Sequence, residues 1–429
     1  MTANPISYVF SCLFVVLAHG AMLVNVFING NYTDLNVVIL LAAAVLFLDV
    51  VYFIAMPFFK QSSYTIDFLL ILILNMSMIF QSSFGGIHFA VKHFITVITA
   101  LIACRIGYLL CRDHNRIQTK KKQIYIAIGI LFIVILTLTG SRSMWISLGP
   151  ISIQPPEFIK PLFVLACATS VTAQQKKHRI LFFNVVYENI ALFGLMLMIC
   201  ILQWWCRDLG SLPTFIGIYI CGFLLRICYP RAKFSKKTFI AAGIVLLAAA
   251  VAAFRLAPAY VQERLHVDIW SDTDGSGYQQ SRALIGIANG GWFGVGPGHG
   301  RLCDVFAHDN DIVFATVCEE WGLLYALMMI CVILITLVIP LINPPRSYFH
   351  GTMAAGVCAA FTVQMTLNIF GSCNMIPFTG VTIPFISTGG SSMAVSGFML
   401  GMLIASQSPE FGKRVQTVKR LPAERRAVR

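Results

Sequence analysis

Long runs of apolar residues recur along most of the chain, separated by short polar stretches. Each run is long enough to cross a hydrocarbon core of roughly 30 Å as an α-helix. A β-barrel would instead show alternating segments of about 10 residues. The pattern predicts about twelve membrane-spanning helices, near residues 6–29, 36–58, 65–82, 88–110, 123–140, 157–173, 182–203, 209–228, 238–257, 311–341, 351–371 and 383–406. The run 311–341 is long for one span, so we expect it to be bent or tilted.

The composition excludes the soluble classes of protein. Of the 429 residues, 58% are hydrophobic and 11% are charged, whereas an average soluble domain carries roughly 25% charged residues. A water-soluble enzyme and a disordered chain are therefore ruled out. Most of the 13 cysteines lie inside apolar runs, without the spacing of metal ligands, so we interpret them as small core residues. The first run has no basic leader and no clear cleavage site, which predicts an anchor rather than a signal peptide.

The net charge of +13 follows from the topology of the chain. Lys and Arg fall almost wholly in alternate loops and in the tail 409–429. The positive-inside rule makes that side cytoplasmic, with both termini inside. Nucleic acid is not an expected partner, because no aromatic and basic surface domain exists. The tail has the charge to contact anionic lipid head groups.

Residues 258–310 form the one large segment outside the membrane, on the outer face. The segment is acidic and rich in glycine, and its aromatic residues favour an ordered structure. A loop of this length is usually functional or disordered. Within it, Gly294–Gly300 superficially resembles a nucleotide-binding loop, but it follows no strand, so we expect it to make tight turns. The pattern predicts chemistry on the outer face.

Glu157 and Lys160 open the sixth predicted span, after two prolines. Their i, i+3 spacing puts them on one face of a helix, where they can pair. Pro156 suits the first helical turn, where its missing N–H is no loss. The pair has two interpretations: a charge pair that anchors the helix end, or the wall of a cavity beneath the outer surface.

Further acids lie at the predicted membrane borders. Arg207 and Asp208 precede the eighth span, as an interfacial pair or as part of a site. Glu319 and Glu320 lie roughly two turns inside the tenth span, so at least one must face protein. A structural hydrogen-bonding role and a catalytic role both remain open for these two residues.

Asp49, Asp67 and Glu188 are lone acids within predicted spans, and we interpret them as structural. A proton relay would need several acids in a chain across the bilayer. The acids cluster on one side instead, which argues against an ion-driven pump.

Six stretches in a fixed order carry a resemblance to one family. They are Trp145–Gly149, Gln154–Lys160, Asp208–Ser211, Trp270–Gln279, Asn310–Gly322 and Ile376–Ser392. In order and spacing they resemble the SEDS family of shape, elongation, division and sporulation proteins, which includes FtsW, RodA and SpoVE, and the resemblance covers roughly residues 65–408. The family's Asp-Pro is Asp272-Thr273 in this chain. Departures of this kind leave the subfamily open: division, elongation or sporulation.

The resemblance implies an all-α polytopic membrane protein with a ten-helix core at residues 63–408. Residues 1–62 would add two N-terminal helices, and residues 409–429 a basic cytoplasmic tail. It also implies a peptidoglycan glycosyltransferase of cell-wall synthesis. Such an enzyme polymerises lipid II on the outer face of the bacterial cytoplasmic membrane. The implied partners are a class B penicillin-binding protein transpeptidase and other membrane proteins of division or elongation complexes.

The family's essential aspartate maps to Asp272, with Asp274 as the nearby alternative. We assign Asp272 as general base for the acceptor sugar hydroxyl. Arginine and lysine suit a diphosphate leaving group, and the candidates are Arg142, Lys160, Arg207 and Arg282. Lys160 is the weaker candidate among them, because Glu157 can neutralise it. The other predicted substrate-binding residues are Trp145, Glu157, Asp208, Tyr278, Gln279 and Asp311. A divalent cation (Mg or Mn) at the diphosphate stays open, because no ligand set identifies one.

Three alternatives remain. A flippase of lipid II would need a polar path that reaches both faces, which the clustered acids disfavour. A non-catalytic membrane scaffold of a cell-wall complex is compatible with the departures around Asp272. A ligase of lipid-linked polymers is a glycosyltransferase of another kind.

Overall fold

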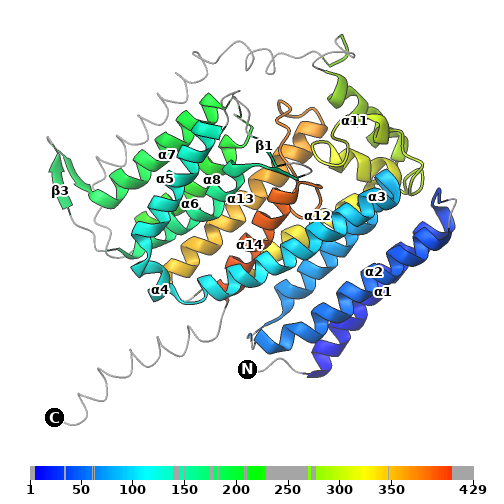
Figure 1. Cartoon of the computed structure of the whole chain (residues 1–429), viewed down its shortest axis with the longest axis horizontal. Helices are drawn as coiled ribbons and strands as arrows, with labels where there is room; N and C mark the ends of the chain where they lie inside the picture. The colour runs from blue at the N-terminus through cyan, green and yellow to red at the C-terminus, as the bar shows by residue number, and fades with distance from the viewer. Residues whose placement is uncertain are drawn as a thin grey trace.

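The computed structural model describes residues 5–32, 35–59, 61, 63–138, 145–148, 151–173, 177–180, 183–206, 208, 210–228, 269–271, 277–345 and 347–407. These residues form a bundle of helices (Figure 1). The helices are α1 (Pro5–Asn29), α2 (Leu35–Ala55), η1 (Met56–Phe59), α3 (Thr65–Cys111), α4 (His114–Thr119), α5 (Lys121–Leu138), α6 (Pro155–Thr172), α7 (Tyr187–Trp205), α8 (Leu212–Cys228), α11 (Tyr278–Gly290), η2 (Leu302–Asp304), α12 (Val313–Ile342), α13 (Tyr348–Ser372) and α14 (Gly390–Ser406). Two short antiparallel strand pairs join them: β1 (Ile146–Leu148) with β2 (Ile151–Ile153), and β3 (Lys177–Ile180) with β4 (Phe183–Val186).

The helices confirm a polytopic all-α membrane fold. Within the described residues, 7 segments are long and apolar enough to cross a membrane. They are Ile6–Asn29, Leu35–Phe59, Thr65–Gly86, His88–Cys111, Tyr187–Trp205, Val313–Ile342 and Tyr348–Ser372. All the predicted spans overlap helices except 238–257, which lies outside the described residues.

Glycines break two of the long helices. At Gly86 the φ angle is 67°, which divides α3 into the two spans predicted at 65–82 and 88–110. The two halves run antiparallel, because Asp67 near the start contacts Arg105 near the end. In α12, Gly322 has a φ of 84°, so the long predicted span is bent as expected.

The last predicted span, 383–406, is wrong at its start, because α14 begins only at Gly390. Residues 383–389 are not helical. Irregular backbone at membrane depth is tolerated where protein satisfies its polar groups. Here Gln81 of α3 donates a hydrogen bond to the carbonyl of Ile386 at 2.9 Å. The apolar character of this segment therefore reflects burial in protein rather than a helical span.

Small residues bring α14 and α3 together at the centre of the bundle (Figure 1). A Cβ added to Gly397 would lie 2.2 Å from the carbonyl oxygen of Ala100, and one on Gly401 would lie 2.0 Å from that of Cys104. Small residues permit this close approach of membrane helices, where packing replaces the hydrophobic effect as the source of association. This contact holds the centre of the bundle, on which the other helices pack.

The lone acids predicted to be structural all have partners inside the fold. Asp49 binds His19 and Asn75, Asp67 binds Arg105, and Glu188 binds Lys121. Asn75 joins the Asp49 cluster to α3. The hydroxyl of Tyr52 on α2 donates to Asp67 at 3.0 Å, so both clusters join the hairpin of α1 and α2 to α3. A charged or polar group in a low-dielectric interior is stable only when it is paired, so these contacts fix the hairpin against the core.

Candidate functional site

The glycine-rich segment 291–300 folds against the break in α12. The carboxylate of Glu319 accepts a hydrogen bond from the N–H of Leu302 at 2.8 Å. The carboxylate of Glu320 accepts one from the N–H of Gly298 at 3.0 Å. Both acids are buried. Of the two interpretations that the sequence left open, the structural one is therefore confirmed for both residues.

The tight turns predicted for Gly294–Gly300 are confirmed. Gly294, Gly296 and Gly298 have φ angles of 80°, 108° and 78°, which residues with a side chain rarely adopt. The turns bring the chain back along α12, where the N–H of Gly296 donates to the carbonyl of Glu320 at 3.0 Å.

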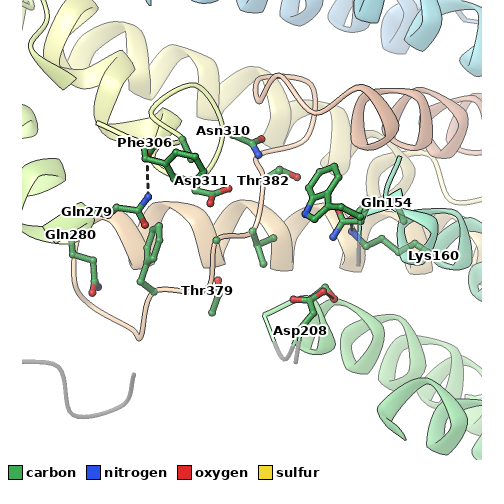
Figure 2. Close-up of a pocket in the computed structure, with 17 residues that line it drawn as sticks. Gln154, Lys160, Asp208, Gln279, Gln280, Phe306, Asn310, Asp311, Thr379 and Thr382 are labelled. Carbon is green, nitrogen blue, oxygen red and sulfur yellow. Dashed lines mark hydrogen bonds and ion pairs between the residues drawn. The ribbon is translucent and has the colours of Figure 1, made fainter. Parts of the chain in front are cut away.

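Beyond these turns the chain lines a polar cavity of about 590 Å³ (Figure 2). Gln279 of α11 donates to the carbonyl of Phe306 at 2.9 Å, which joins α11 to the segment that follows η2. The cavity is lined by Trp145, Gln154, Glu157, Lys160, Asp208, Ser211, Gln279, Gln280, Phe306, Ala307, Asn310, Asp311, Phe378, Thr379, Gly380, Val381 and Thr382. Residues far apart in the sequence thus form one site.

Six predicted site residues meet in this cavity: Trp145, Glu157, Lys160, Asp208, Gln279 and Asp311. Figure 2 shows Lys160 and Asp208 at one end and Gln279 at the other, with Asp311 between them. The cavity therefore has a charged end, carried by α6 and the turn before α8, and an amide-rich end, carried by α11.

The charged end is built on the first turn of α6. Pro155 and Pro156 begin this helix. Pro156 stands in the first turn as predicted, and the helix begins two residues before the predicted span 157–173. Lys160 Nζ lies 2.6 Å from Glu157 Oε1, and the whole Lys160 residue is 2% exposed. The two interpretations of this pair are therefore compatible: the charges pair, and they also form a cavity wall.

Asp208 is held at the same end by its own turn. Ser211 donates to its carboxylate at 2.6 Å. Burial raises the pKa of Asp208 above its ordinary value, and the hydrogen bond from Ser211 opposes this. Gly210 permits the turn to contact the segment 376–382, because an added Cβ would lie 2.4 Å from the carbonyl oxygen of Thr379.

Asp311 stands just before α12. Its N–H donates to the carbonyl of Ala307 at 2.8 Å. Burial, and to a smaller extent the nearby Asp309, raises the pKa of Asp311 to about 7. With its pKa near neutral pH, this carboxyl can serve as hydrogen-bond donor or as acceptor.

The pKa of Asp311 predicts a pH-dependent stability. The native carboxyl keeps its proton up to about pH 7, whereas an ordinary aspartate loses it near 3.8. The native state thus binds more protons between these values, so stability should fall as the pH rises from about 4 to about 7. Asp311→Asn should remove this fall and raise the unfolding free energy at pH 8, by at most about 4 kcal/mol.

Thermal unfolding in detergent at pH 5 and pH 8 measures this effect. The control is Asp304→Asn, which changes an exposed acid of the same segment. An unchanged pH dependence in Asp311→Asn would contradict the assigned pKa.

Several polar residues of the cavity were not predicted individually. They are Gln154, Ser211, Gln280, Asn310, Thr379 and Thr382. Gln280 donates to Asn374 Oδ1 at 3.1 Å, which joins α11 to the end of α13. The threonines belong to the stretch Ile376–Ser392, which the resemblance had already singled out. The polar residues of this stretch stand just before an apparent membrane span, and this position was the signal in the sequence that could have identified them as site residues.

Some predicted residues stand elsewhere. Within the described part of the chain, Tyr278 and Arg282 are not among the residues that line the cavity. Arg282 is exposed, and its guanidinium lies over the Tyr278 ring at 5.4 Å from the centroid. Asp272, Asp274, Arg142 and Arg207 lie outside the described residues. Their assignments, like that of Arg282, rest on the sequence.

The cavity combines one buried cation with amides, hydroxyls and carboxyls. Amide and carboxylate side chains are hydrogen-bonding partners for sugar hydroxyls, and lysine binds phosphate as a point charge. Among the described residues, no group of three or more His, Cys, Asp or Glu side chains is placed to hold a metal ion. The arrangement fits a ligand that carries both a sugar and an anionic group.

Fold and site thus define a multi-pass helical membrane protein with a polar cavity at one end of its bundle. Residues 56–409 match the family described as cell cycle protein, FtsW/RodA/SpoVE. The chain belongs to this family.

Two relatives illustrate the similarity. A probable peptidoglycan glycosyltransferase FtsW of Shewanella sediminis is 29% identical over 327 residues, which are 72% of this chain and 75% of that protein. A peptidoglycan glycosyltransferase RodA of Mycobacterium tuberculosis is 29% identical over 295 residues, which are 65% of this chain and 61% of that protein.

Solved structures share the fold. A chain of a peptidoglycan synthase complex aligns with a TM-score of 0.62 at 20% identity, over 80% of this chain and 97% of that chain. RodA of Thermus thermophilus aligns with a TM-score of 0.55 at 18% identity, over 80% of this chain and 96% of that chain.

Proposed function

We propose that this chain is a peptidoglycan glycosyltransferase that polymerises lipid II into glycan strands. The observation that carries the proposal is membership of a family whose matched relatives are named for this activity over most of the chain. The polar cavity supports it, because it joins a buried lysine to a wall of amides and hydroxyls. The reaction would serve cell division, elongation or sporulation.

The reaction joins a hydroxyl of the acceptor sugar to the anomeric carbon of the donor. A new glycosidic C–O bond forms, the bond from the anomeric carbon to the polyprenyl diphosphate breaks, and the hydroxyl proton passes to a base. Asp272 is the proposed base, with Asp274 as the alternative. The diphosphate leaves with two or more negative charges, which need cations nearby. Lys160 supplies one, and Arg142, Arg207 and Arg282 are the further candidates.

The two ends of the cavity suit the two parts of the substrate. Lys160 is held by Glu157 at 2.6 Å, so its ammonium is oriented before a ligand arrives. Gln279 and Asp311 lie along the other wall with amides and hydroxyls that match sugar groups. We therefore assign the diphosphate to the Lys160 end and the saccharide to the Gln279 end, with Trp145 and Asp208 as the remaining contacts in the cavity. The proposed role of Tyr278, which is not among the lining residues, rests on the sequence.

The membrane arrangement forms part of the proposal. The basic loops favour cytoplasmic termini and a cavity on the outer face of the bacterial cytoplasmic membrane. Residues 63–408 would be the catalytic core, with 1–62 as two additional helices and 409–429 as the cytoplasmic tail. A class B penicillin-binding protein is the proposed partner, together with other membrane proteins of the division or elongation complex. The fold shared with a chain of a peptidoglycan synthase complex supports this choice.

Product analysis with labelled lipid II tests the function. The purified full chain in detergent, alone and with a class B partner, should convert lipid II into glycan strands that a muramidase digests. Movement of lipid II across vesicles without polymer would favour a flippase, and transfer of preformed polymer would favour a ligase. Absence of all three activities with the partner present would leave a scaffold and overturn the proposal.

A further inference from the structure

Residues 29–32, called the α1–α2 turn below, touch the glycine-rich loop that leads to the cavity. The N–H of Asn31 donates to the carbonyl of Pro297 at 2.9 Å. The amide of Asn31 also reaches the carbonyl of Gly298 at 3.4 Å. The family match begins at residue 56, so this turn lies outside it. The contact is therefore a feature of this chain beyond the part that defines the family.

The loop is shaped to accept the turn. A Cβ added to Gly296 would lie 2.8 Å from the carbonyl oxygen of Asn29. One added to Gly298 would lie 3.4 Å from the Cβ of Asn31. Only Gly296 has no room for a side chain against the hairpin, whereas the 3.4 Å at Gly298 is an ordinary van der Waals contact. Both glycines have a positive φ, which favours glycine at these positions.

The hairpin itself is fixed to the core. His19 Nδ1 lies 2.8 Å from Asp49 Oδ2, and Asn75 of α3 donates to the other oxygen of Asp49 at 2.9 Å. All three side chains are fully buried. Moving the hairpin away from α3 would take Asn75 from Asp49 and the carbonyl of Leu72 from His19, which leaves buried polar groups without their partners and is costly. The turn is therefore a fixed support rather than a mobile strap.

The glycine-rich loop connects the hairpin to the cavity wall through a series of further contacts. Gly298 is bound by Glu320 on its other side, and Leu302, four residues on, is bound by Glu319. Leu302 belongs to the same small apolar cluster as Ala283 of α11, and it lies against Gly286 of that helix, where an added Cβ would be 2.4 Å from Leu302 Cδ1. The same helix carries Gln279, whose side chain joins Phe306 in the cavity wall. A continuous path of contacts thus leads from the hairpin to the amide-rich end of the cavity.

We infer that the α1–α2 turn is a positioning element for the loop side of the cavity. The inference rests on the proposed function. The Lys160 end is carried by α6, which packs on α5, α8, α13 and α14. Displacing the turn should therefore lower kcat while KM, governed by the diphosphate end, stays within about twofold. A misplacement of about 1 Å far from the chemistry can cost roughly 10²-fold in rate.

One experiment locks the contact. Disulfides join Cβ atoms about 3.5–4.5 Å apart, close to the 3.4 Å between Asn31 Cβ and a Cβ placed on Gly298. Asn31→Cys with Gly298→Cys should cross-link on oxidation, read by mass spectrometry as the disulfide-linked peptide that joins the two positions, because the 13 native cysteines would also react with a maleimide. The oxidised protein should keep at least half the kcat of its own reduced form. Failure to cross-link, or inactivity that reductant reverses, would overturn the inference.

A second experiment loosens the contact. Gly296→Ala adds a methyl against the hairpin, whereas the control Gly291→Ala adds one at a positive φ of 54° with nothing within 4 Å. In Gly296→Ala, amide hydrogen exchange across 294–311 should rise by about tenfold or more, and kcat should fall by about tenfold at unchanged KM. Exchange equal to that of the control, or a loss carried by KM, would contradict the positioning role. The exchange readout needs no turnover, so it decides this question even if lipid II polymerisation is not observed.

Discussion

Asp272→Ala should abolish lipid II polymerisation, with a rate at least about 10³-fold below that of the unmodified chain. General-base catalysis contributes roughly 10²–10⁴-fold, and the acceptor hydroxyl is a poor nucleophile while it keeps its proton. The family resemblance assigns the base to this position, seven residues before Gln279 in the cavity wall. Initial rates of polymer formation from labelled lipid II measure the effect.

Asp274→Ala is the matched control for this substitution. It removes a carboxyl two positions away, and we expect it to retain most of the activity. Both variants should keep the thermal unfolding midpoint of the unmodified chain. Full activity in Asp272→Ala would contradict the assignment of Asp272 as general base. A loss of activity confined to Asp274→Ala would assign the role of base to Asp274.

Lys160→Ala should have the second large effect, because it removes the one cation among the described residues that line the cavity. Loss of one preorganised group that stabilises developing charge typically costs roughly 10²–10³ in kcat. The same change leaves Glu157 buried without its partner, which should lower stability by about 3–5 kcal/mol. Rate measurements and thermal unfolding report the two effects separately.

A double variant separates chemistry from folding. Glu157→Gln with Lys160→Met removes both charges, so no unpaired ion remains and stability should recover most of the loss. Its activity should stay as low as that of Lys160→Ala. Glu157→Gln alone keeps the cation and should lose less than about tenfold. A double variant that polymerises lipid II at the unmodified rate would show that Lys160 has only a structural role.

The local features of this fold were predictable from the sequence, and its long-range contacts were not. Apolar runs located the helices, and the i, i+3 spacing predicted the Glu157–Lys160 pair that the structure shows at 2.6 Å. The apolar run 383–406 led to a predicted helix start that is too early, because its first residues are apolar without being part of a membrane-spanning helix. They are buried between Gln81 of α3 and the segment near Asn310. Hydropathy indicates that a segment is removed from water, and it does not distinguish burial in lipid from burial in protein.

The candidate site shows the same limit. The sequence singled out mainly charged residues, since a charge in an apolar chain stands out, and the neutral candidates Trp145, Tyr278 and Gln279 came from the family resemblance. Neutral residues such as Gln280 and Thr379 carry no such signal, and their place in the cavity wall depends on contacts between α11, α13 and the segment 376–382. The contact of Asn31 with Pro297 joins positions that are far apart in the chain, and no local pattern indicates it.

The buried carboxylates of Glu319 and Glu320 have a consequence for engineering. They bind backbone N–H groups of Leu302 and Gly298, so loop and helix break form a single module. A chimera that imports residues 291–302 from a relative without the matching segment 319–322 would leave Glu319 and Glu320 without their hydrogen-bond partners in the bundle interior. Loops of this class should therefore be exchangeable between homologues only together with the broken helix that caps them.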